Sequence, residues 1–369
     1  APVTVELTGG LDSRLNFAAA VKAGRHFTAR TIVDIDERDT AAARRLASLC
    51  GTEHLQVSPL EDIAANFESD LTMIHRLSDG ETDCLNVIAS PSANRQSIKG
   101  SVQSVSGIGG EILRGKYYRS HTRGGNGVDL KRLLEWQLGL SSGYEESLFR
   151  TDYADGRARM LADEVSTIMA EDTTRDAWHR LEHFYAFGTL QGAGGCSVTF
   201  NNFFYRQVVP LCSNALLDVA FKLVPSLKKS GLAMRRAIMR LNPEIADVPL
   251  CTGLPARPLR VSDAAALLQS SILLSARVAR KAGAKLGFLK PGRAVGRKLA
   301  ETVNERLAAL CRRELVIDKM ASAPLYNAEA LSGFVSRNIE RGFPDRMQVG
   351  LMLSTELTLR YVGSNLKLG

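Results

Sequence analysis

The residues best suited to chemistry lie near the start of the chain, in the segment Thr-Gly-Gly-Leu-Asp-Ser at positions 8–13. Glycines allow backbone N–H groups to approach a phosphate closely, and a helix that begins beside them adds partial positive charge. The hydroxyls of Thr8 and Ser13 are further donors, and the carboxylate of Asp12 is a suitable magnesium ligand. The segment therefore predicts a phosphate site with a metal ligand beside it.

The flanking residues predict the elements that would position this segment. Val3–Leu7 places β-branched and apolar residues at alternating positions, which is typical of a short buried strand. Leu11–Val21 is a helical run, and Gly24 is a C-terminal stop. The alternative is an ordinary turn between strand and helix, in which Asp12 or Ser13 caps the helix and no ligand binds.

Further strands and helices alternate along the first third of the chain. This alternation predicts an α/β fold with a doubly wound parallel sheet. Ligands of such sheets bind beyond the carboxyl ends of the strands, where residues 8–13 and the segment after Ser106 both fall. The expected strands are Phe27–Val33, His54–Val57 and Val102–Ser106, and the expected helices are Asp39–Cys50, Leu60–Leu77 and much of Thr82–Lys99.

A second glycine-rich segment, Ser-Gly-Ile-Gly-Gly-Glu-Ile-Leu-Arg-Gly-Lys-Tyr, occupies positions 106–117. An ordinary glycine-rich loop would also explain it. Its position after the fourth strand makes it a stronger candidate for a ligand site, because it would then lie at the same sheet edge as Asp12. Glu111 is the acidic residue of this segment.

The two segments together resemble known signatures. The first resembles the PP-loop, Ser-Gly-Gly-x-Asp-Ser, of the ATP pyrophosphatases, with Thr8 in place of the first serine. The second resembles the asparagine synthetase family signature Ser-Gly-x-Gly-x-Asp-Glu-x-x-x-Gly-Tyr, in which Gly107, Gly109 and Tyr117 match. Glu111 stands at the second magnesium-binding aspartate of that family. Later segments, including Val209–Ala220, extend the resemblance over about residues 1–250.

The resemblance implies a fold of the adenine nucleotide alpha-hydrolase (HUP) type and the cofactors ATP and Mg²⁺. It implies an amide-forming ligase that adenylates a carboxylate, releases pyrophosphate and transfers nitrogen from ammonia, glutamine or an amine. It assigns nucleotide binding to Leu7, Thr8, Gly9, Gly10, Asp12, Ser13, Val33, Ser106 and Gly107, and catalysis with metal binding to Asp12 and Glu111.

Several substitutions favour a relative of asparagine synthetase over the housekeeping enzyme. Ile112 replaces the acid that follows the metal ligand, Val208 replaces an arginine, and Leu250 stands where the family has a lysine. We therefore expect aspartate or a natural-product, glycan or peptide carboxylate as substrate. Full-length family members begin with a glutaminase domain, so a glutaminase domain or partner is a further expectation.

The chain is expected to divide into three consecutive parts. Residues 1–123 would form the ATP-binding α/β domain, residues 124–250 a helical lobe, and residues 251–369 a basic helical C-terminal region. Helices of the lobe are expected at Leu130–Leu138, Ala158–Ala170, Ala177–Thr189 and Asn214–Leu223.

The composition is that of a soluble globular protein, with 369 residues of which 45% are hydrophobic and 23% charged. The six cysteines are scattered and form no C-x-x-C pair, which is typical of reduced cytosolic thiols. The longest apolar stretch, Ala264–Ala276, is interrupted by polar residues and too short to span a bilayer. We expect a cytoplasmic protein with no membrane association.

The net charge of +8 is concentrated in one segment, Arg257–Lys298, which carries ten basic residues and one acidic residue. A solvated basic face is the preferred interpretation. Nucleic-acid binding is the alternative, and it would suit a PP-loop enzyme that acts on tRNA. Stacking on single strands is disfavoured, because the segment has few aromatic residues.

Two further alternatives remain open. His179-Arg-Leu-Glu-His183 matches the H-x-x-E-H pattern of inverted zinc peptidases, and histidines four apart on a helix face one metal ion. A short pattern of this kind also arises by chance on a solvated helix face, which is the preferred interpretation. The other alternative is a nucleotide-binding protein that has lost catalysis.

Overall fold

The computed structural model describes residues 2–97, 103–117, 122–123, 127–137, 145–172, 176–264, 267–268, 271–272, 275 and 297–365. The chain forms two compact units, each assembled from three separate stretches. The sheet unit comprises Ala1–Pro59, Ala93–Gly115 and Phe204–Ala300, and the helical unit comprises Leu60–Ser92, Lys116–Phe203 and Glu301–Gly369. This division differs from the three consecutive ranges expected from the sequence, because the chain leaves the sheet after its third strand and returns twice.

The sheet unit contains a five-stranded sheet in the order β3-β2-β1-β4-β7, and every neighbouring pair is parallel. The α/β class and the parallel sheet predicted from the alternating pattern are confirmed. The first four strands lie within the predicted ranges, whereas the fifth was not predicted. The strands are β1 (Val3–Glu6), β2 (Thr28–Ile32), β3 (His54–Val57), β4 (Gln103–Val105) and β7 (Arg206–Val208).

Helices of the sheet unit begin and end at residues with clear local causes. Asp36 accepts hydrogen bonds from the amides of Arg38 and Asp39 and so caps α2. Gly24 and Gly51, just beyond α1 and α2, have φ of +64° and +60°, which favours glycine. The helices are α1 (Leu11–Lys22), α2 (Glu37–Leu49), α10 (Asn214–Lys222), α11 (Pro225–Lys228), α12 (Leu232–Leu241) and α13 (Pro243–Asp247).

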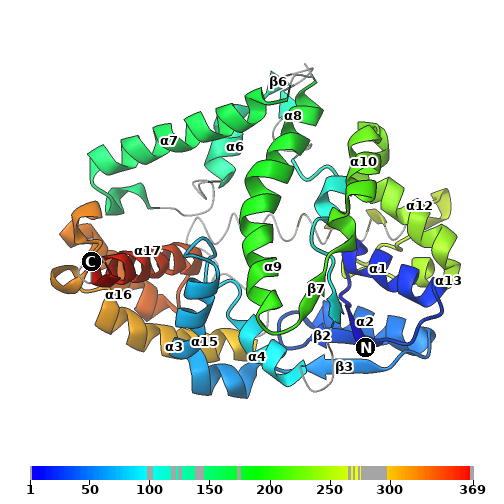
Figure 1. Cartoon of the computed structure of the whole chain (residues 1–369), viewed down its shortest axis with the longest axis horizontal. Helices are drawn as coiled ribbons and strands as arrows, with labels where there is room; N and C mark the ends of the chain where they lie inside the picture. The colour runs from blue at the N-terminus through cyan, green and yellow to red at the C-terminus, as the bar shows by residue number, and fades with distance from the viewer. Residues whose placement is uncertain are drawn as a thin grey trace. The chain divides into compact units, whose positions relative to one another are not determined.

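These helices form a layer in which α1 contacts α12, α12 contacts α13 and α13 contacts α2 (Figure 1).

The strand order determines where a ligand site is expected. From β1 the sheet continues through β2 to β3 on one side, and through β4 to β7 on the other. The crevice between the carboxyl ends of β1 and β4 is therefore the topological switch point of the sheet. Residues 8–13 follow β1 and residues 106–117 follow β4, so both glycine-rich segments begin at this point.

The helical unit contains most of the remaining helices. Figure 1 shows α8 and α9 as one continuous helical column, in which the π-helix Tyr185–Gly194 joins them. In the described part of the chain, no helix combines the length and the apolar character needed to cross a membrane. The elements are α3 (Leu60–Leu77), β5 (Thr122–Arg123), β6 (Gly127–Val128), α6 (Leu130–Gln137), α7 (Thr151–Ala170), α8 (Ala177–Phe184), α9 (Gly195–Asn202), α16 (Ala328–Arg341) and α17 (Arg346–Asn365), whereas α4 (Ala89–Ser97) and α15 (Arg297–Glu314) have residues in both units.

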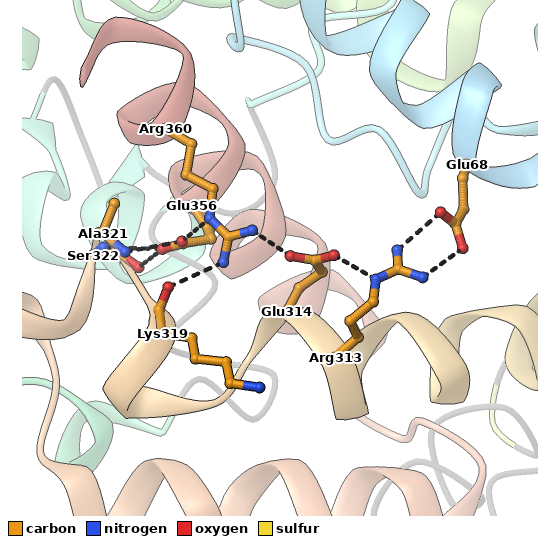
Figure 2. A network of polar contacts seen from close by, with 8 residues as sticks. All are labelled: Glu68, Arg313, Glu314, Lys319, Ala321, Ser322, Glu356 and Arg360. Atoms are coloured by element: carbon orange, nitrogen blue, oxygen red, sulfur yellow. Dashed lines mark hydrogen bonds and ion pairs between the residues drawn. The ribbon is translucent and has the colours of Figure 1, made fainter. Parts of the chain in front are cut away.

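A chain of charged side chains joins α3, α15 and α17 within the helical unit (Figure 2). Arg360 bonds both Glu356 and Glu314, and Glu314 also bonds Arg313, whose guanidinium reaches Glu68. Glu356 is the buried end of the chain at 1% exposure, whereas Glu68 is 57% exposed. The network therefore runs from the interior of the unit to its surface.

The buried carboxylate of Glu356 is surrounded by donors. It accepts hydrogen bonds from the amides of Ala321 and Ser322, both at 2.9 Å, and from the Ser322 hydroxyl at 2.6 Å. Burial alone would raise the pKa of Glu356, but these bonds and the one from Arg360 outweigh it and lower the pKa below 4.5. The ionised carboxylate consequently stabilises the folded unit.

We predict that Glu356→Gln lowers the free energy of unfolding at pH 7 by about 2–4 kcal/mol, because the new amide N–H groups would face donors. The matched change Glu68→Gln, at the exposed end of the same network, should cost less than about 1 kcal/mol. Urea unfolding followed by circular dichroism measures both.

The difference between wild type and Glu356→Gln should also depend on pH. A carboxylate whose pKa is lowered by folding contributes stability above its unfolded pKa, and the contribution is lost as the pH falls through the folded pKa. The difference should therefore be constant above about pH 4.5 and narrow at lower pH. If Glu356→Gln and Glu68→Gln lost the same free energy of unfolding, or if the difference between wild type and Glu356→Gln did not depend on pH, this account would be contradicted.

Candidate functional site

The first glycine-rich segment leaves the sheet at Leu7, whose side chain is fully buried. The Leu7 amide donates to the Arg30 carbonyl at 2.8 Å, and its own carbonyl accepts from the Thr31 hydroxyl at 2.7 Å. Both backbone polar groups of Leu7 are therefore bonded to β2. Leu7 was predicted to bind the nucleotide, but its buried side chain cannot contact a ligand.

The loop after Leu7 is fixed by its own hydroxyl groups. The Ser13 hydroxyl accepts from the Thr8 amide at 3.1 Å and lies 2.9 Å from the Thr8 hydroxyl, which in turn accepts from the Gly10 amide at 3.2 Å. Ser13 is buried and Thr8 is exposed. The two hydroxyls predicted as phosphate donors thus shape the loop that would present the backbone amides.

The start of α1 has no side-chain cap within the described residues, because Gly10 occupies the N-cap position. The capping role that the alternative gave to Asp12 or Ser13 is therefore wrong. Asp12 instead lies in the first turn, where the partial positive charge of the helix favours a carboxylate or another anion.

Two residues that the sequence analysis did not single out hold Gly9. Its amide donates to Asp39 Oδ1 at 3.0 Å, and its carbonyl accepts from the Cys251 amide at 3.2 Å. A Cβ at Gly9 would lie 2.7 Å from Asp39 Oδ1 and 3.0 Å from Cys251 Cβ, so only glycine fits. Burial and the neighbouring Asp36 raise the pKa of Asp39. The sequence signal that could have pointed to Asp39 as a site residue was its place in the first turn of the helix that follows β2.

The segment that carries Cys251 is fixed by a buried arginine. Arg14 is fully buried and donates to the carbonyls of Ile245, Val248 and Pro249. Burial lowers the pKa of Arg14 to about 10, so it remains charged at neutral pH. Leu250, one of the substitutions noted in the sequence analysis, is 8% exposed and brings no charge to this place.

The second glycine-rich segment packs against the first turn of α1. The Ser106 amide donates to the Val208 carbonyl at 2.9 Å, and the Ser106 carbonyl accepts from Asn16 Nδ2 at 2.7 Å. A Cβ at Gly107 would lie 3.0 Å from the Ser13 amide nitrogen. A Cβ at Gly110 would lie 2.4 Å from Asp12 Cγ. The two segments that sequence analysis placed at one sheet edge are therefore in direct contact.

The carboxylates predicted to share a magnesium ion share an arginine in this structure. Arg114 Nη2 donates to Asp12 Oδ2 at 2.6 Å and lies 3.6 Å from Glu111 Oε1. Glu111 lies in the 3₁₀ turn Gly110–Leu113, and Arg114 follows it at the spacing of three residues that brings helical side chains together. That spacing was the sequence signal for Arg114, although sequence analysis gave this residue no role.

The other predicted residues lie as follows. Val33 directly follows β2, and its amide donates to the Val57 carbonyl at 2.9 Å. It therefore lies at the carboxyl end of the strand next to β1, which the first glycine-rich segment follows. Arg257, in the basic segment, forms ion pairs with Asp247 and Asp263 at distances of 2.6 and 2.7 Å. It therefore links α13 to the segment around Asp263. Most of Arg257–Lys298 lies outside the described residues.

The histidines of the H-x-x-E-H pattern lie beside different carboxylates. His179 Nδ1 lies 3.4 Å from Asp176, and His183 Nε2 lies 3.2 Å from Glu171. Glu182 is buried. Over the described ranges, no group of three or more histidine, cysteine, aspartate or glutamate side chains is arranged to hold a metal ion. All six cysteines lie in these ranges, and none forms a disulfide bond.

Known protein families give no guide to this site. No family model matches the chain, and a search of curated proteins found none that is similar to it.

The contact between the two segments gives a testable prediction at Gly110. We expect Gly110→Ala to lower the free energy of unfolding by about 1–3 kcal/mol, because its Cβ would overlap Asp12. Gly156 lies in the interior of α7 with nothing within 4 Å of a Cβ, so Gly156→Ala should raise stability by about 0.5–1 kcal/mol. The shift in urea midpoint measures both changes, and a shift of the same sign for both would contradict the close contact.

Proposed function

We propose that the chain binds ATP at the switch point between β1 and β4 and uses it to activate a carboxylate for amide formation. One observation carries the proposal: Gly107 and Gly110 pack directly against the residues Asp12 and Ser13 of the other glycine segment. The two glycine-rich loops thereby lie side by side where open α/β sheets bind nucleotides, which supports a shared phosphate site. A sheet of the adenine nucleotide alpha-hydrolase (HUP) type is part of this proposal.

The residues of the site have separate roles in this proposal. Backbone amides at the start of α1 would hold the phosphates, with Thr8 and Ser13 keeping the loop in shape. The backbone at Val33, beyond the next strand, would contact the adenine. Ser106 and Gly107 would border the nucleotide from the side of β4.

Asp12 and Glu111 would hold Mg²⁺. Their carboxylates approach one cationic nitrogen, Arg114 Nη2, at 2.6 and 3.6 Å, so both can face a single positive centre. Carboxylate oxygens together with phosphate oxygens are the ligands that Mg²⁺ prefers. When bound, the ion would neutralise charge on the triphosphate.

The proposed reaction has two steps. A carboxylate oxygen of the substrate attacks the α-phosphorus of ATP, and the bond to the β-phosphate breaks, so that pyrophosphate leaves. A nitrogen nucleophile then attacks the acyl carbon, AMP leaves, and the nitrogen loses a proton to give the amide. Positioning and neutralisation of charge are the main demands on the protein in the first step, because no protein nucleophile is required.

The substrate is proposed to be aspartate or a natural-product, glycan or peptide carboxylate, with ammonia, glutamine or an amine as nitrogen source. Ile112 and Leu250, which replace charged residues of the asparagine synthetase family, are 1% and 8% exposed and pack in the interior. The chain therefore lacks these two family charges, which supports a relative of asparagine synthetase over the housekeeping enzyme. A cytoplasmic location would provide ATP and keep the six thiols reduced.

The test is pyrophosphate release from ATP and Mg²⁺ with ammonia and a panel of carboxylates. We predict release that depends on one class of carboxylate and falls at least a hundredfold in Asp12→Ala, which corresponds to about 2.7 kcal/mol of transition-state stabilisation. Asp218→Ala, an exposed carboxylate on α10, is the matched control and should retain full activity.

The outcomes separate the candidate functions. Tight ATP binding without release for any carboxylate would sink the ligase proposal and favour a nucleotide-binding protein. Release that requires tRNA in place of a carboxylate would favour the PP-loop enzymes that act on tRNA. Equal activity of wild type and Asp12→Ala would remove Asp12 from the mechanism.

A further inference from the structure

Arg114 lies where the two proposed metal ligands converge. Its Nη2 donates to Asp12 Oδ2 at 2.6 Å, which is short for a charge-assisted hydrogen bond, and it lies 3.6 Å from Glu111 Oε1. The Arg114 side chain is 35% exposed, and those of Asp12 and Glu111 are 20% and 31% exposed. The three side chains therefore form a partly screened cluster with two negative charges and one positive charge.

The aliphatic part of the Arg114 side chain packs beside Gly231. The methylene carbons Cγ and Cδ lie 3.5 and 3.6 Å from where a Cβ of Gly231 would be. Gly231 has a φ of +67°, which favours glycine, and Leu11 Cδ1 would lie 2.7 Å from the same Cβ. Among the described residues, the buried Nε of Arg114 has no hydrogen-bond partner, and the guanidinium contacts both carboxylates through Nη2.

A guanidinium that lies against a carboxylate opposes the binding of a magnesium ion to the same carboxylate, because two cations would then lie within a few ångströms of each other. Mg²⁺ requires oxygen ligands at about 2.0–2.1 Å in near-octahedral geometry. Arg114 Nη2 lies 2.6 Å from Asp12 Oδ2, so metal binding at Asp12 favours a state in which the guanidinium has moved away. A displaced guanidinium then needs another anionic partner, and phosphate is one that it binds in a bidentate manner.

We propose that Arg114 couples metal binding to polyphosphate binding at this site. Without polyphosphate, Arg114 occupies the carboxylates of Asp12 and Glu111 and opposes metal binding. When a polyphosphate enters beside α1, Arg114 moves to its oxygens and releases the carboxylates to the metal. The inference rests on the proposed function, because it assumes that the polyphosphate of ATP binds in this crevice.

The coupling has a thermodynamic consequence that does not depend on catalysis. If polyphosphate favours the state in which Arg114 has left the carboxylates, metal must favour polyphosphate binding by the same factor. Part of any such coupling comes from direct contact between metal and phosphate, so a variant at Arg114 is needed to isolate its contribution. Arg114→Gln keeps a polar side chain and removes the charge.

The experiment measures Mn²⁺ binding by electron paramagnetic resonance without nucleotide, and pyrophosphate binding by calorimetry in EDTA. Relative to wild type, we predict that Arg114→Gln binds Mn²⁺ at least tenfold more tightly and pyrophosphate at least tenfold more weakly. Arg45→Gln, an exposed arginine on α2, is the matched control and should change neither affinity. Arg114→Lys keeps the charge but not the fork, so it should lie between wild type and Arg114→Gln in both measurements.

Mn²⁺ affinity that is unchanged or lower in Arg114→Gln, with the variant folded by circular dichroism, would overturn the inference. Pyrophosphate affinity that is equal in wild type and Arg114→Gln would overturn it too. If ATP with Mg²⁺ still binds both proteins in either case, the proposed function stands without this inference. If wild type binds neither ATP with Mg²⁺ nor pyrophosphate, the proposed function fails and the inference fails with it.

Discussion

The candidate site depends on the close approach of two loops that follow neighbouring parallel strands. Gly107 lies against the Ser13 amide, and Gly110 lies against the side chain of Asp12, with no space for a Cβ at either position. This contact places the 3₁₀ turn with Glu111 directly beside the first turn of α1. The meeting of Asp12, Glu111 and Arg114 requires the loops to be this close.

The sequence predicted the elements that carry the site, because their signals are local. The first strand, α1 with its glycine stop, α2 and α3 all follow from periodicity and terminating residues, and α3 lies at the predicted bounds of Leu60–Leu77. The sequence placed both glycine-rich segments at the carboxyl ends of strands, whereas the strand order that makes this edge the switch point came from the structure. The sequence did not predict β7, whose three residues Arg206–Val208 are too short and too polar to show a strand pattern.

The contacts that fix the site could not be predicted, because they join residues far apart in the chain. Arg14 binds carbonyls more than 230 positions away, at Ile245 and Val248, and no local pattern indicates such partners. Asp39 binds the Gly9 amide from the first turn of another helix. For Thr8 and Ser13 the chemistry was clear, but two hydroxyls at this spacing can equally bond each other, and in the structure they do.

The charged groups around the first loop have a consequence for any ligand. Arg14 lies behind the loop, and its guanidinium donates to the backbone carbonyls of Ile245, Val248 and Pro249. In front of the loop, the carboxylates of Asp12 and Glu111 lie beside Arg114. A polyanion that entered alone would lie next to these carboxylates, whereas a polyanion with a divalent cation would meet ligands for both of its parts. The arrangement therefore favours a metal-bound polyphosphate over either component alone.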